Sequence, residues 1–272
     1  PISSKLYIWC GYIGLIIFTA LLAFGSLREL PLDTHDDEIL RDHEIAKELT
    51  YFFLPAEQKE FSAPGRPFSE LVRWFGFLVW GNDVAAFHTY CVLLHIFASV
   101  LLSITAIYLG VSLHTSMLGG WLFLLNVSHF RAFHTLVNTD YPLALIWCLS
   151  GIISYVKYYQ SSSISMLMLA SFFFILGVGT HQASIVVVLF LFSWIWITNK
   201  NVLKSLYFFI PITFVLLFIS YLLLQIADSG GATTHKSLSQ LISNSLITTV
   251  PSVLRVIFWL TSRLFKIGRA HV

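Results

Sequence analysis

Long apolar stretches recur along the whole chain, and they restrict how it can fold. Residues 6–24 form an uncharged run, and at about 1.5 Å per residue a helix of this length matches a hydrocarbon layer of roughly 30 Å. Only 11% of the 272 residues are charged, against about 25% in a soluble domain. The runs lack the alternation of outer-membrane strands. We therefore expect an all-α, polytopic transmembrane helical bundle.

Eight membrane spans are expected in a single membrane-embedded domain, residues 1–266. Pro251 does not exclude the last span, because neighbouring helices can satisfy the backbone groups that a proline frees. Residues 267–272 resemble a translated sequencing adapter, so we place that tail outside the domain and expect the chain to be a fragment. The predicted spans are residues 6–24, 85–109, 112–125, 141–155, 164–178, 183–198, 206–226 and 246–264.

A polar segment, residues 28–66, separates the first two spans and holds ten of the 14 acidic residues. A carboxylate cluster beside a membrane is costly unless it is paired, hydrated or used. Asp36 and Asp37 could therefore carry chemistry, or they could only stabilise the start of a helix expected over residues 36–49. Residues 68–80 are rich in aromatic side chains, which favours a helix at the membrane interface, although a simple re-entry into the second span is the alternative.

Lysines and arginines in the short loops predict the orientation. They favour a cytoplasmic N-terminus, since the short outer connections then carry Arg131, Lys236 and little other positive charge. The acidic segment, the loop 126–140 and the turn 179–182 would then share the outer face. A dispersed net charge of +2 argues against a nucleic-acid partner. The basic residues expected inside are Lys5, Lys157, Lys200, Lys204, Arg263 and Lys266.

Several short motifs follow one another in a definite order. Asp36-Asp37-Glu38 precedes Gly65-Arg66-Pro67-Phe68-Ser69-Glu70-Leu71, a Gly81-Asn82 break and a span from His88 to His95. Over residues 6–198 this order resembles the N-terminal membrane half of GT-C class glycosyltransferases, nearest the protein O-mannosyltransferase-like and tetratricopeptide-linked branch. The resemblance implies a GT-C-like bundle whose large first extracytoplasmic loop bears short interfacial helices.

The resemblance also implies an activity. Such enzymes transfer a hexosyl or pentosyl group from a polyprenyl-phosphate donor to a protein, lipid or glycan acceptor. They act on the outer or lumenal face, so the expected location is a bacterial inner or plasma membrane or the endoplasmic reticulum. The partners expected are the lipid-linked donor, the acceptor and membrane lipids.

An inverting transfer needs a base for the acceptor hydroxyl, and a carboxylate is the usual choice. By resemblance the base is Asp37 if Asp37-Glu38 matches the family's Asp-Glu pair, or Asp36 if the family's Asp-Asp pair is the better match. Glu38 is expected beside the donor. Arg66 is the candidate phosphate contact, because a guanidinium offers bidentate donors, and a surface or lipid-headgroup arginine is the alternative.

Two later polar segments add candidate binding residues. His129, Arg131 and Asp140 lie in or at the end of the second outer loop. By resemblance Asp140 is a supporting carboxylate that orients acceptor or sugar hydroxyls, and it could also cap the fourth span. His181 stands where relatives commonly carry lysine. It could donate a neutral hydrogen bond, become protonated beside phosphate, or be structural.

No cofactor is predicted firmly. The histidines lack the spacing of a helical metal site, although a divalent cation could bind Asp36, Asp37 and the donor phosphate. Cys10, Cys91 and Cys148 are interpreted as apolar core residues. A catalytically inactive GT-C-like assembly partner is the first alternative function. A transporter or flippase is the second, disfavoured because the spans contain few charges and no repeated interrupted helices.

Overall fold

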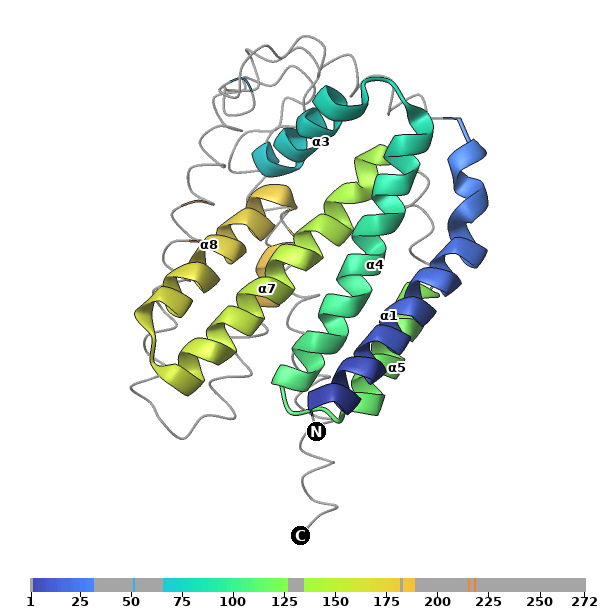
Figure 1. Cartoon of the computed structure of the whole chain (residues 1–272). Coiled ribbons are helices and arrows are strands. Elements are labelled where there is room, and N and C mark those ends of the chain that lie inside the picture. The colour runs from blue at the N-terminus through green and yellow to red at the C-terminus, as the bar shows by residue number, and fades with distance from the viewer. Residues whose placement is uncertain are drawn as a thin grey trace, which may run out of the picture.

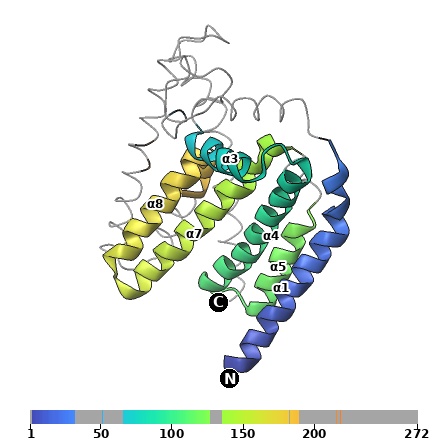
Figure 2. The ribbon, with the colours of Figure 1, turned by 45° about the horizontal axis from the view of Figure 1, so that its top comes forward.

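The structure is a computed structural model that describes residues 2–31, 51, 66–126, 135–181, 183–188, 215 and 218. The elements of this part of the chain are all helical, without strands. Helices α1, α4, α5, α7 and α8 lie side by side as a bundle, and α3 crosses one end of it (Figures 1 and 2). The elements are α1 (Ile2–Phe24), η1 (Gly25–Glu29), α3 (Pro67–Trp80), α4 (Val84–Tyr108), α5 (Leu113–Leu124), η5 (Leu136–Thr139), α7 (Asp140–Ser161) and α8 (Ile164–Thr180).

Two helical segments in the described ranges are long and apolar enough to cross a membrane. They are Leu6–Glu29, with 24 residues, and Val84–Tyr108, with 25 residues. Helix α8 is also apolar but shorter. Large apolar side chains cover their outward faces, among them Leu22 on α1, Leu93 on α4 and Phe172 on α8. The first two segments are candidate membrane spans, one of them near the N-terminus.

The predicted helices 6–24, 68–80, 85–109, 112–125 and 164–178 are found within a few residues of their expected bounds. The helix that contains the predicted fourth span, residues 141–155, is longer than that span, because α7 continues to Ser161. Tyr158 packs in the core beyond the predicted span, and Ser162, at φ 55°, ends the helix. Outside the described residues lie the predicted elements 36–49 and 246–264, 183–198 beyond residue 188, and 206–226 apart from residues 215 and 218.

Small and polar side chains hold α1, α4 and α5 together. The hydroxyls of Tyr12 and Ser103 are 2.7 Å apart, and Trp121 Nε1 donates to Thr19 Oγ1 at 3.2 Å. Gly120 lies where α5 meets Ser103 and Tyr12. Such contacts are typical of helices packed in lipid, where close backbone approach and hydrogen bonds replace the hydrophobic driving force.

Helix α3 turns its polar side toward the bundle. Ser69, Glu70 and Arg73 are buried, whereas Phe75, Leu78 and Val79 are exposed. Pro67 suits the first turn, because its missing N–H would have no helical partner there. This orientation brings Ser69 and Arg73 against the first residue of α7, and helix α3 itself lies near α8 (Figure 1).

Candidate functional site: an arginine–aspartate cluster

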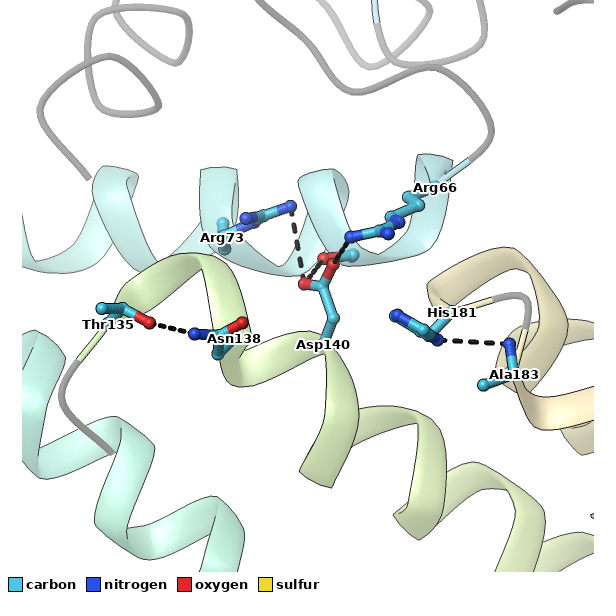
Figure 3. Close-up of polar contacts among 8 residues, drawn as sticks. Arg66, Arg73, Thr135, Asn138, Asp140, His181 and Ala183 are labelled. Carbon is cyan, nitrogen blue, oxygen red and sulfur yellow. Dashed lines mark hydrogen bonds and ion pairs between the residues drawn. The ribbon is translucent and has the colours of Figure 1, made fainter. Parts of the chain in front are cut away.

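Asp140, the first residue of α7, is fully buried and is contacted by Arg66, which immediately precedes α3, and by Ser69 and Arg73 of α3. Arg66 Nη1 donates to Asp140 Oδ2 at 3.1 Å, and Arg73 Nη2 lies 3.5 Å from Asp140 Oδ1. Ser69 Oγ also donates to Oδ1. Figure 3 shows the two guanidinium groups approaching the carboxylate from α3 above. We call Arg66, Ser69, Arg73 and Asp140 the Asp140 cluster.

Helical spacing on α3 explains why these donors meet one carboxylate. Positions 66, 69 and 73 differ by three and four residues, so they lie on one side of the helix. Asp140 is suited to the start of α7, because a carboxylate is favoured at a helix N-terminus. The predicted N-cap role is wrong. Thr139 occupies the N-cap position, and the Asp140 side chain bonds to α3 instead.

The two arginines of the cluster differ in burial: Arg73 is buried and Arg66 is partly exposed. Arg73 is 4% exposed, and its Nε has no hydrogen-bond partner within the described residues. The Arg66 side chain is 28% exposed and, in the same part of the chain, bonds only to Asp140. A buried ion pair is favourable only when its remaining donors and lone pairs are well satisfied, which the Ser69 hydrogen bond assists. Asp140 therefore holds Arg66 in a fixed position while part of the Arg66 side chain stays exposed.

His181 follows α8 and lies next to this cluster. Its ring centroid is 4.3 Å from that of Tyr141, the residue after Asp140. Its Nδ1 accepts a hydrogen bond from the backbone N–H of Ala183 at 3.2 Å. Burial, and secondarily the Arg66 charge, lower the pKa of His181, while Asp140 opposes the shift. The imidazole is therefore neutral at neutral pH.

Of the residues predicted from sequence, the structure brings Arg66 and Asp140 into contact and places His181 beside them (Figure 3). Asp36, Asp37, Glu38, His129 and Arg131 lie outside the described residues.

The described flanks of the acidic segment lie at the same end of the bundle. The Leu30 carbonyl oxygen is 3.2 Å from Nε2 of His88, near the start of α4. Arg66 precedes α3. The acidic segment is therefore connected at both ends to the end of the bundle that carries the Asp140 cluster.

Arg73 and Ser69 were not predicted as site residues. The sequence reading assigned the charges of residues 68–80 to an interfacial helix because aromatic residues surround them. The signal that could have found them is the spacing of Arg66, Ser69 and Arg73 on one helical face, which the abundance of aromatic residues on α3 obscured.

His95 and two of the three cysteines pack inside the bundle in the described ranges. His95 stacks on Phe123 with centroids 4.9 Å apart. No three His, Cys, Asp or Glu side chains gather to hold a metal within the part of the chain that the structure describes. Cys91 and Cys148 are buried, but Cys10 is exposed on α1, so its predicted core position is wrong.

Comparisons with protein-family models, curated proteins and solved structures find no match to this chain. The likeness to GT-C enzymes consequently rests on the order of the short motifs alone. The chemistry that the cluster fits best is the recognition of an anion, because the partly exposed Arg66 has more N–H donors than its hydrogen bond to Asp140 uses, while Asp140 already accepts hydrogen bonds from Arg66 and Ser69.

Proposed function

We propose that the chain is a polytopic, GT-C-like membrane glycosyltransferase that uses a polyprenyl-phosphate sugar on the extracytoplasmic or lumenal face. The observation that carries this proposal is the exposed side of Arg66, which Asp140 holds at the end of the bundle where the acidic segment is attached. A guanidinium held by one carboxylate retains N–H donors for phosphate oxygens. The carboxylates of the attached segment supply candidates for the base.

The exposed apolar surfaces support a membrane setting. Helix α1 has few buried residues, and its outward side is lined by large apolar side chains. Phe75, Leu78 and Val79 form an apolar outer side on α3, which suits a helix lying at the interface between lipid and water. The Asp140 cluster would then lie under α3, near the level of lipid phosphates.

The other end of α7 supports the orientation. Lys157 lies more than four turns beyond Asp140, and its Nζ is 5.5 Å from the ring centroid of Tyr108, near the end of α4. With the cluster outside, Lys157 is on the cytoplasmic side, where positive charge is favoured.

The proposed reaction requires few groups. The acceptor oxygen forms a bond to the anomeric carbon as the bond from that carbon to the phosphate oxygen breaks, and the bonding pair leaves with the phosphate. Asp37 or Asp36 takes the acceptor proton. Arg66 stabilises the charge on the leaving phosphate. Asp140 fixes Arg66 rather than orienting sugar hydroxyls, because its oxygens already accept hydrogen bonds from Arg66 and Ser69.

The test is acceptor-dependent release of polyprenyl phosphate, the product common to every sugar, from a panel of polyprenyl-phosphate hexoses and pentoses. The intact protein is assayed in proteoliposomes. Asp36→Asn or Asp37→Asn should reduce release by about 10² or more, since the amide keeps the shape but cannot take a proton. Glu57→Gln, in the same segment, is the matched control.

Two results would count against the proposal. Unchanged release in both Asp variants would end the assignment of the base to this pair. No release from any donor by the wild type would favour an inactive assembly partner.

A further inference from the structure

The hydrogen bond to His181 determines which ring nitrogen carries the proton. The Ala183 backbone N–H donates to Nδ1 at 3.2 Å. An amide nitrogen cannot accept a hydrogen bond, so Nδ1 must supply a lone pair. The neutral imidazole therefore carries its hydrogen on Nε2.

Other contacts fix the orientation of the His181 ring. Tyr141 packs against it at 4.3 Å and 37° between ring planes. Figure 3 shows Nδ1 toward Ala183 and the other nitrogen on the side of Asp140 and Arg66. The ring is partly exposed. In the described part of the chain Nε2 has no hydrogen-bond partner, so its N–H is available to a ligand.

Burial is the main reason that the ring is neutral, because it lowers the pKa of His181 more than either nearby charge changes it. Arg66, at the start of α3, and Asp140, at the start of α7, act on it in opposite directions, and burial adds to the effect of Arg66. Tyr141 presents a ring rather than a charge. His181 can thus add a hydrogen-bond donor beside Arg66 without adding a second cation that would repel it.

We infer that His181 donates its Nε2–H to an oxygen of the same phosphate that Arg66 contacts. The site would then recognise a lipid phosphodiester through one fixed cation and one neutral donor. The identity of the phosphate rests on the proposed function, whereas the tautomer rests on the structure alone.

Two amide substitutions separate the ring nitrogens. The side-chain amide of His181→Gln reaches the position of Nε2, and that of His181→Asn reaches only the position of Nδ1. The probe is farnesyl methyl phosphate, a phosphodiester without a sugar, and its equilibrium binding to the intact protein is measured at pH 7.5. His181→Gln should stay within about twofold of wild type. His181→Asn should weaken binding by about threefold to tenfold, the value of one hydrogen bond. His114→Ala, at an exposed histidine on α5, is the control.

Nitrogen-15 spectra of the histidine rings in wild-type protein test the tautomer without any change in the site. The peak of His181, assigned by its loss in His181→Gln, should show hydrogen on Nε2. Hydrogen on Nδ1 would overturn the inference, and so would wild-type affinity in His181→Asn. In either case binding of the probe by wild type would leave the proposed function standing. Failure of wild type to bind the probe would instead overturn both.

Discussion

Arg66 Nη1 and Asp140 Oδ2 lie 3.1 Å apart although 74 residues separate them in the chain. The contact fastens the start of α3 to the first residue of α7. Arg73 approaches the other carboxylate oxygen about two turns further along the chain, at 3.5 Å. One buried carboxylate thus joins α3 to the bundle at two points, and Arg66 is the more exposed of its two cationic partners.

This arrangement predicts unequal effects on stability. Asp140→Asn leaves Arg73 buried without a counter-ion, so it should lower the free energy of unfolding by about 3 to 5 kcal/mol. Arg66→Gln should cost at most about 1 kcal/mol, because solvent screens a partly exposed pair. Thermal unfolding of detergent-purified protein measures both. Equal, small losses would show that the buried pair does not fasten α3.

Two adjacent glycines on α5 provide a matched test of the helix packing. A Cβ at Gly120 would lie 2.5 Å from the Ser99 carbonyl oxygen and from the Tyr12 hydroxyl, whereas one at Gly119 meets nothing within 4 Å. Gly120→Ala should therefore destabilise the protein by about 1 to 3 kcal/mol. Gly119→Ala should be neutral or slightly stabilising, since alanine favours a helix. The same unfolding assay would contradict this packing if both variants behaved alike.

The lowered pKa of His181 predicts sensitivity to acid. Burial and Arg66 reduce this pKa in the folded protein, so the unfolded chain binds the proton more readily. The stability that the neutral ring contributes is complete above about pH 6.5, the ordinary histidine value, and declines as the pH falls toward the lower folded pKa. His181→Gln should lose less stability than wild type between pH 6.5 and 5. Parallel curves for the two proteins would argue against the shift.

The orientation can be tested at two described turns. Asn82 lies between α3 and α4 at the cluster end, and Ser161 ends α7 at the other end. Single cysteines at these positions, in a background without native cysteines, should react with an impermeant reagent from opposite sides of the membrane. Asn82→Cys should be labelled from outside. Labelling of both from the cytoplasm would remove the basis for an outer-face site.

The helices could be predicted more fully than the site. The extents of α1 and α4 follow from apolar runs, which are local in sequence. The end of α7 could not be predicted, because the contacts of Tyr155 and Tyr158 depend on neighbouring helices. The exposure of Cys10 depends likewise on which side of α1 faces its neighbours.

The contact between Arg66 and Asp140 could not be predicted from the sequence either. Composition marked Arg66 and Asp140 as polar residues next to apolar runs, but nothing local could join positions 74 residues apart. The hydrogen bond from Ala183 to His181 likewise depends on the conformation of the chain after α8. The spacing of Arg73 was visible, but only the packed structure turns that side of α3 inward.

Binding of farnesyl methyl phosphate to wild type, Arg66→Ala, Arg66→Lys and Arg28→Ala tests most directly whether Arg66 recognises a lipid phosphate. Arg28 is exposed in η1, so its removal deletes a cation without touching the Asp140 cluster. Arg66→Ala should weaken binding by about 1.5 to 3 kcal/mol, roughly tenfold to 150-fold. Arg66→Lys should also bind more weakly, because an ammonium cannot form the paired donors of a guanidinium. Arg28→Ala should match wild type. Affinity unchanged in Arg66→Ala would contradict the proposed recognition of a lipid phosphate by Arg66.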